Sequence, residues 1–228
     1  IHRTLNKHNY NNYFSINSNS SLLIGGIPYE DYNYNKKIFN NLEFSIPEIS
    51  SILEYNPKSS VLKGEDALET NIKNFDFANI NYLHFSTHGT SDLYDYFNSS
   101  LILGLDNEND GLLRFNEICA LDLSNTDLVF LSACQTSSGK DIENIGSLSL
   151  NDAFIIAGAQ SVISTLWMID DKATSIFVDN FHSNNFIRNN KSYKYAPHLL
   201  NKAKLDFIKN HEEYKNPYFW AGFVSYGL

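Results

Sequence analysis

Two residues of this sequence have side chains suited to covalent catalysis, and each stands at the end of a short apolar run. His88 and Gly89 follow the run 82–87, and Cys134 ends the run 128–134. A cysteine can attack a carbonyl carbon, a histidine can protonate the departing amine, and backbone N–H groups can hold the oxyanion. We therefore interpret His88 and Cys134 as a candidate pair for a cysteine hydrolase, with the N–H groups of Gly89 and Cys134 as oxyanion donors.

Both residues also have a structural interpretation. Cys134 can be a buried core thiol, which is common, and His88 can be bonded to a loop carbonyl. Spacing and periodicity do not decide between the two. The small neighbouring residues agree with the catalytic interpretation, because they would leave room for a substrate chain. They are Ser86, Thr87, Ser132 and Ala133.

The elements that must position this pair are predicted from apolar runs that alternate with helical patterns. Strands are expected at 21–27, 60–63, 82–88, 128–134, 161–167 and 219–226, a hairpin at 100–115, and helices at 46–55, 64–72, 148–157, 172–186 and 196–210, with Asn116 capping a short helix. Such alternation predicts a three-layer α/β/α sandwich with a mainly parallel sheet. The carboxyl ends of parallel strands share one edge, so His88 and Cys134 are expected to face one crevice.

Composition limits the classes of function. The chain has 228 residues, enough for one large domain, and its net charge of −9 disfavours direct binding of nucleic acid. The two cysteines favour a reducing cytoplasm over a disulfide scaffold, and no apolar run is long enough to span a membrane. Residues 1–20 are expected to be a linker from an upstream module, because the chain begins with Ile and this stretch has no apolar period.

Several ordered motifs together resemble the CHAT domain, the caspase-like peptidase family related to separase and the caspases. These motifs are His84-Phe-Ser-Thr-His88-Gly89, Asp110 to Ile118, Asp127-Leu-Val-Phe-Leu-Ser-Ala-Cys134, Ala153 to Trp167 and Pro217 to Phe223. The resemblance covers residues 21–228. It implies a caspase-like fold with an inserted β-hairpin and a catalytic dyad of His88 and Cys134.

The resemblance also implies partners. Proteolytic members of the family cleave a protein partner when an attached sensor, often a tetratricopeptide repeat module, or a separate activator is engaged. Some members serve bacterial immunity, including CRISPR-linked systems. We accordingly expect a regulated cytoplasmic endopeptidase that needs no cofactor, and the polar loop 135–146 is a candidate for ordering on activation. A catalytically silent docking domain with the same fold is the alternative.

Substrate-binding residues are expected in the exit loop of the strand 161–167, because the resemblance implies that this strand pairs with the substrate backbone. Asp170 and Asp171 stand there, and a carboxylate would favour a basic residue before the cleaved bond. Either carboxylate can instead cap the following helix, Asp171 in particular because it stands just before Lys172. Trp167 is expected to line the core or the pocket.

Metal chemistry is less well supported. Residues 106–117 nearly fit a calcium loop, but the third place holds Glu108 and the flanks are predicted to be strands. His84 and His88 have the spacing of a zinc motif on a strand, whereas zinc proteases place it on a helix. We therefore expect no metal.

Overall fold

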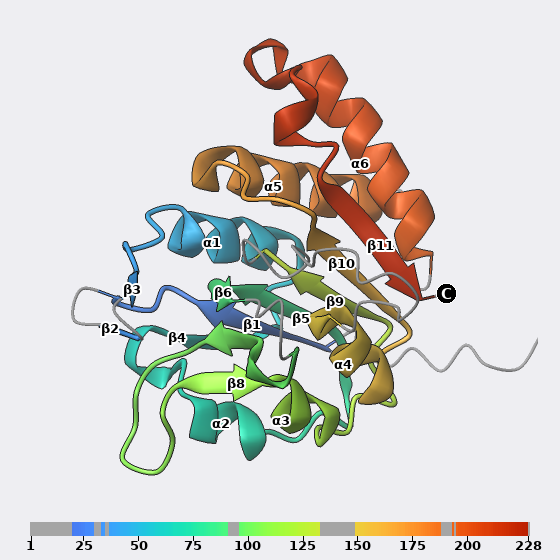
Figure 1. Ribbon diagram of the computed structural model, residues 1–228. Coiled ribbons are helices and arrows are strands. Elements are labelled where there is room, and N and C mark those ends of the chain that lie inside the picture. Colours follow the sequence, from blue (N-terminus) through green and yellow to red (C-terminus); the bar gives the residue numbers. More distant parts are fainter. Residues whose placement is uncertain are drawn as a thin grey trace, which may run out of the picture.

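The computed structural model describes residues 20–29, 33–34, 37–90, 96–132, 149–187, 193 and 195–227. This described part forms a layered α/β fold (Figure 1). Its central sheet has the strand order β11-β10-β9-β5-β1-β4. The strands are β1 (Ser20–Gly25), β4 (Ser60–Lys63), β5 (Ile80–Ser86), β9 (Leu128–Leu131), β10 (Ser161–Thr165) and β11 (Phe223–Gly227). Only the pairing of β10 with β11 is antiparallel among these strands.

Helices cover both faces of this sheet. One face carries α1 (Ser45–Tyr55), α5 (Asp171–Ile187) and α6 (Ala196–Asn210), which lie above the sheet in Figure 1. The other face carries α2 (Glu69–Lys73), α3 (Phe115–Cys119) and α4 (Leu150–Ile156). This arrangement is the predicted α/β/α sandwich.

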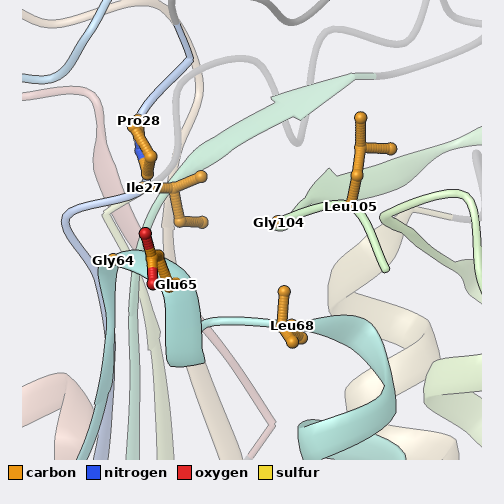
Figure 2. Close-up of a pocket in the computed structure, with 7 residues that line it drawn as sticks. All are labelled: Ile27, Pro28, Gly64, Glu65, Leu68, Gly104 and Leu105. Atoms are coloured by element: carbon orange, nitrogen blue, oxygen red, sulfur yellow. The ribbon is translucent and has the colours of Figure 1, made fainter. Parts of the chain in front are cut away.

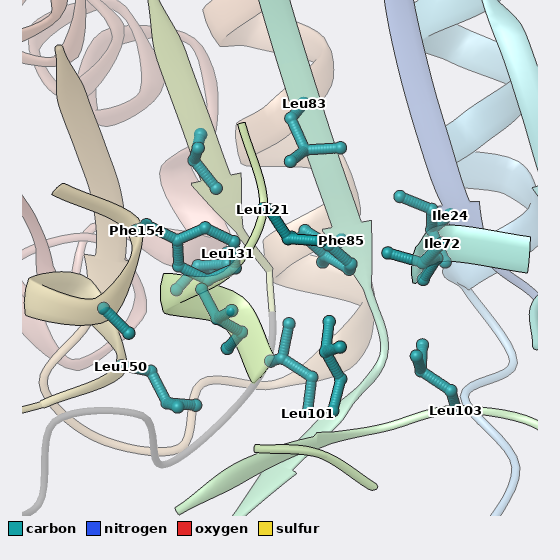
Figure 3. Close-up of a cluster of buried hydrophobic side chains, with 14 of the residues drawn as sticks. Ile24, Ile72, Leu83, Phe85, Leu101, Leu103, Leu121, Leu131, Leu150 and Phe154 are labelled. Atoms are coloured by element: carbon teal, nitrogen blue, oxygen red, sulfur yellow. The ribbon is translucent and has the colours of Figure 1, made fainter. Parts of the chain in front are cut away.

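Alternation along the inner strands divides the core in two. On β9, Leu128 and Phe130 face α5 and α6, whereas Val129 and Leu131 face the opposite layer, as the two-residue period of a strand requires. All four side chains are fully buried. Figure 3 shows the half of the core that contains Val129 and Leu131, in which Leu131 packs near Phe85 and Phe154. Burial on both faces explains why these strands read as continuous apolar runs.

A second, antiparallel sheet stands beyond the carboxyl end of β5. It contains β6 (His88–Thr90), β7 (Ser100–Ile102) and β8 (Leu112–Arg114), in that order. The pairing of β7 with β8 confirms the predicted hairpin. The remaining short elements are β2 (Asn33–Tyr34), β3 (Lys37–Ile38) and the 3₁₀ turns η1 (Gly64–Asp66), η2 (Tyr96–Asn98), η3 (Glu212–Tyr214) and η4 (Pro217–Phe219).

Several details of the prediction were wrong. The strand expected at 219–226 begins only at Phe223, because the chain forms the 3₁₀ turn η4 before it, and the helix expected at 64–72 is divided into η1 and α2. The run expected as one strand over 82–88 is divided, because β5 ends at Ser86 and the chain enters the second sheet at His88. Asn116 does not cap α3, which begins one residue earlier at Phe115. The Glu117 carboxylate accepts the N–H of Arg114 at 2.9 Å and so closes the start of this helix.

The predicted linker 1–20 lies outside the described residues except for Ser20 and stays a prediction. Across the described ranges, every helix is too short or too polar to cross a lipid bilayer.

Candidate active site

The strands that precede the two candidate catalytic residues lie side by side in the central sheet. Strands β5 and β9 are parallel neighbours, with Phe85 opposite Leu131. The pairing continues past the end of β9, because the N–H of Ser132 donates to the carbonyl of Phe85 at 2.8 Å. His88 follows β5 by two residues. Cys134 follows Ser132 by two residues and itself lies outside the described residues, as does the loop 135–146.

His88 is held by a backbone carbonyl and two aromatic rings. Its Nε2 lies 2.7 Å from the carbonyl oxygen of Asn40. Its ring meets Tyr29 edge-on at a centroid distance of 4.7 Å and Phe39 at 5.1 Å. The loop carbonyl expected by the structural interpretation is therefore present. Since a carbonyl only accepts, Nε2 carries a proton, and Nδ1 of the neutral ring is the nitrogen left to accept one.

The surroundings of His88 favour the neutral imidazole. Burial lowers the pKa of His88 below its usual value, and the hydrogen bond to the Asn40 carbonyl acts in the opposite direction without cancelling that effect. The ring is therefore largely uncharged at pH 7 and able to take up a proton from a neighbouring thiol.

Tyr29 holds the backbone of His88 through its hydroxyl group. Its hydroxyl accepts the N–H of His88 at 3.2 Å and donates to the carbonyl of Ile102 at 2.9 Å. The ring is almost fully buried. Tyr29 thus joins the segment after β1 to β6 and β7, two of the three strands of the second sheet. The sequence offered no sign of this role, because an isolated Tyr after a Pro has no motif.

The start of α1 is hydrogen-bonded to the residues at the carboxyl ends of β1 and β5. The Ser45 hydroxyl donates to the carbonyl of Ser86 at 2.8 Å and accepts the N–H of Gly26 at 2.8 Å. A Cβ at Gly25 would lie 2.5 Å from this hydroxyl oxygen and 2.7 Å from the Ser86 carbonyl, so Gly25 permits the close approach. These contacts hold the strand that leads to His88.

Glu48 is a further buried charge that sequence reasoning missed. Apolar spacing would place Ile46 on the buried face of α1, yet 41% of Ile46 is exposed, whereas Glu48 is only 1% exposed. The Glu48 carboxylate contacts His84 Nε2 at 2.7 Å and Ser132 Oγ at 3.0 Å. Helical spacing alone would have allowed Glu48 on the inner face, because it precedes Ile52 by one turn.

Gly89 occupies the middle of β6, opposite Leu101 of β7. It directly follows His88 and is buried. Its role as an oxyanion donor stays a prediction, as does that of Cys134.

The three candidate substrate-binding residues lie beyond the end of β10. Asp170 is exposed, and its Oδ1 accepts the N–H of Ala173 at 2.9 Å, so it caps α5. Asp171 Oδ2 accepts the N–H of Phe44 at 2.9 Å, which ties α5 to the start of α1. Trp167 is half-buried, and its Nε1 donates to the carbonyl of Tyr218 at 2.9 Å. The capping residue is therefore Asp170 and not Asp171, which is the first residue of α5. The substrate roles of Asp170, Asp171 and Trp167 stay predictions.

In the stretch 106–117, which nearly fits a calcium loop, the carboxylate of Asp106 is used in hydrogen bonds within the protein. Asp106 Oδ1 accepts the N–H groups of Glu108 and Asn109 at 2.7 Å each, and Oδ2 accepts the Thr70 hydroxyl at 2.8 Å. Its part from Asp106 to Gly111 lies between β7 and β8, as the sequence indicated, but the stretch ends at Glu117 inside helix α3, so its second flank is a helix and not a strand. In the described ranges, His, Cys, Asp and Glu side chains form no group of three or more that could hold a metal ion.

A hollow of about 270 Å³ opens at the carboxyl ends of β1 and β4 (Figure 2). Ile27, Leu68 and Leu105 give it apolar walls, and Glu65 contributes a carboxylate. Pro28 on its rim directly precedes Tyr29, which contacts His88. Among the described residues that line the hollow, none has a nucleophilic side chain.

Solved structures with the same fold are cysteine proteinases. The chain superposes on the Arg-specific cysteine proteinase gingipain R with a TM-score of 0.60 and 10% identity, over 92% of this chain and 46% of that one. A complex of Porphyromonas gingivalis RgpB pro- and mature domains gives a TM-score of 0.57 and 10% identity, over 92% and 47%. The architecture is therefore the caspase-like α/β fold of these proteinases.

The family follows from the sequence comparison. The family model for the CHAT domain matches residues 10–228, and the chain belongs to this family. Tetratricopeptide repeat protein 28 of Mus musculus is 31% identical over 118 residues, which is 51% of this chain and 4% of that protein. Its Homo sapiens counterpart is 31% identical over 100 residues, or 44% of this chain. This chain thus spans only a small part of these curated relatives.

Proposed function

We propose that this chain is a cysteine endopeptidase whose catalytic dyad is His88 and Cys134. The observation that carries the proposal is the pairing of β5 with β9, which continues to Ser132 beyond the end of β9. Two residues span at most about 7 Å of chain, so both candidate side chains start close to the same sheet edge. Membership of a peptidase-like family and the fold of the gingipains support the same chemistry.

The proposed reaction begins with transfer of the Cys134 thiol proton to Nδ1 of His88. The sulfur then forms a bond to the scissile carbonyl carbon, and the electron pair of the C=O bond moves to its oxygen, which accepts hydrogen bonds from the N–H groups of Gly89 and Cys134. Collapse of this intermediate breaks the C–N bond, and His88 returns its proton to the departing amine. The Asn40 carbonyl, bonded to Nε2, orients the ring and stabilises the charged imidazolium.

Water completes the cycle. It attacks the thioester carbon while His88 removes one of its protons, and the C–S bond breaks to release the acid and restore the thiol. The lowered pKa of His88 supports this sequence of steps, because the ring must be neutral before it takes a proton from the thiol or from water.

We assign Asp170, Asp171 and Trp167 to substrate binding at the exit of β10. Asp170 is the strongest of the three, because it is exposed and uses one oxygen for its cap. A carboxylate here would favour Arg or Lys before the cleaved bond. The Arg specificity in the printed title of gingipain R agrees with this assignment.

We further propose that a repeat-containing module or a separate activator regulates the peptidase, and that its target is a protein partner. The name of the matched relatives, tetratricopeptide repeat protein 28, supports a repeat-module context. A place in bacterial immunity is the biological setting that family membership suggests. Ordering of the loop 135–146 on activation is part of this proposal.

A positional library of fluorogenic peptide amides, incubated with the wild type and with Cys134→Ala, tests the proposal. We expect hydrolysis by the wild type alone, and a co-purified protein partner should be cut by the same form. If both forms bind that partner and neither cleaves it or any peptide, the docking-domain alternative holds.

A further inference from the structure

A chain of buried polar side chains crosses the layer between the sheet and the helices α1 and α5. It starts at Ser132, whose hydroxyl donates to Glu48 Oε2 at 3.0 Å, and continues from Glu48 Oε1 to His84 Nε2 at 2.7 Å. His84 Nδ1 lies 2.7 Å from the Tyr82 hydroxyl, which lies 3.0 Å from His182 Nε2. The mechanism proposed above uses none of these side chains directly.

Burial makes the Glu48 carboxylate depend on its two partners. Glu48 is 1% exposed and His84 is fully buried. An isolated buried carboxylate is strongly destabilising, so both of its oxygens need partners, and His84 and Ser132 occupy one oxygen each. The Tyr82 hydroxyl bonds the other ring nitrogen of His84 and also bonds His182, and Phe130 packs against the His84 ring. These hydrogen bonds together restrict the positions of Glu48, His84 and Ser132.

Ser132 is the member of this network that stands nearest to the proposed nucleophile in the sequence. Its N–H is bonded to the Phe85 carbonyl at 2.8 Å, and its hydroxyl is bonded to Glu48. The residue is therefore held by β5 through its backbone and by α1 through its side chain. It is 8% exposed, and Cys134 follows two residues later. The position of Ser132 sets where the segment carrying Cys134 begins.

We propose that Glu48 and Ser132 are positioning residues for Cys134, with His84 as the partner that holds the Glu48 carboxylate in place. This inference rests on the proposed function for its catalytic consequence. Neither residue contacts the substrate in this account. They act by fixing the start of the nucleophile segment relative to the segment that ends in His88.

The test compares Ser132→Ala and Ser132→Thr with the wild type and a matched control, Ser21→Ala. Ser21 is also a buried Ser whose hydroxyl bonds a side chain, that of Asn56, but at the amino end of β1. Fluorogenic peptides from the positional library provide kcat and KM, hydrogen exchange reports on residues 133–148, and thermal unfolding checks the fold.

We expect Ser132→Ala to lower kcat by about 100-fold with KM unchanged, the size of loss that a misplacement of about 1 Å produces. Exchange in 133–148 should become faster, and Ser132→Thr, which keeps the hydroxyl, should restore most of kcat. Ser21→Ala should match the wild type in kcat and in exchange of this segment. Wild-type kcat in Ser132→Ala, or a Thr variant as slow as the Ala variant, overturns the inference while leaving the proposed function intact.

Hydrogen exchange separates the two proposals if the wild type cleaves no peptide. In that case the proposed function fails. Faster exchange of 133–148 in Ser132→Ala than in Ser21→Ala would still support the positioning role, and equal exchange in the two variants would overturn it.

Discussion

Nε2 of His84 lies 2.7 Å from Oε1 of Glu48, and both side chains are buried. This pair joins α1 to the central strand β5, and the second oxygen of Glu48 extends the connection to Ser132 beyond β9. The two strands that lead to the proposed dyad are therefore linked by a buried ionisable pair as well as by their backbones. Several measurable consequences follow from this pair and from the contacts of His88.

Removal of one member of the pair should be costly. We expect His84→Leu to lower the free energy of unfolding by about 3–5 kcal/mol, because Glu48 would keep a buried charge without its main partner. Urea denaturation measures the loss. The double variant Glu48→Leu with His84→Leu should recover much of it, and a double variant less stable than His84→Leu would contradict this account of the pair.

Tyr29→Phe should weaken the second sheet where it meets His88. The substitution removes the hydroxyl that bonds the His88 N–H and the Ile102 carbonyl, and groups left unpaired in a buried site cost about 1–3 kcal/mol. Tyr218→Phe is the matched control, because its hydroxyl also donates to a carbonyl, that of Met168, but is exposed. Equal urea midpoints for the two variants would argue against the role of Tyr29.

Acid should destabilise the fold through its histidines. Burial, and secondly the charge of His84, lower the pKa of His182 well below its usual value, and burial lowers that of His88. The unfolded chain takes up protons at these residues below about pH 6.5, whereas the native state resists them, so stability should fall as the pH drops from 7 to 5. Urea unfolding of the wild type and His182→Gln checks this: the variant should show the shallower slope, and equal slopes would exclude His182 as the cause.

Asp171 should give a pH dependence of opposite sign at lower pH. Burial raises its pKa, and the nearby Glu48 adds to the rise, although the Phe44 N–H acts against it. The native state therefore holds a proton that the unfolded chain loses just above the ordinary carboxyl pKa, and this contribution to stability disappears as the pH rises through the raised pKa. Asp171→Asn keeps an acceptor for Phe44 and should be the more stable form at pH 7 by thermal unfolding. A less stable variant would mean that the charge itself is required.

Substitution of Asp170 should change specificity more than stability. If its carboxylate binds a basic residue before the cleaved bond, Asp170→Asn should lower kcat/KM for Arg peptides by about tenfold relative to Ala peptides, the effect of about 1.4 kcal/mol. Asp122→Asn is the control, because Asp122 is likewise exposed and accepts a backbone N–H, that of Ser124, in the turn before β9. An unchanged ratio of Arg to Ala hydrolysis would remove Asp170 from the substrate site.

The layered fold was predictable because its strands are buried on both faces. Runs such as 128–131 are continuously apolar, and the helix 196–210 was predicted with its observed bounds. The division at Thr87 was not predictable, since β5 and β6 are separated by one residue and no turn residue marks the change of sheet. Periodicity reports burial and cannot report which sheet a strand joins.

The candidate site was only partly predictable for a related reason. His88 was identified because His followed by Gly at a strand end has a chemical meaning. Its partners Asn40 and Tyr29 come from distant segments and contribute a carbonyl and a hydroxyl that many residues could supply. Glu48 was hidden because a carboxylate in a helix is usually exposed, and only its pairing with His84 reveals why it is not.

The most direct measurement of the central claim is the mass of the acyl-enzyme. A peptide that the wild type hydrolyses is mixed with enzyme, quenched in acid within the first turnover, and the protein is digested and analysed by mass spectrometry. We predict the acyl group on Cys134, none on Cys119, and neither adduct nor hydrolysis in Cys134→Ala. Hydrolysis that persists in Cys134→Ala would contradict the account.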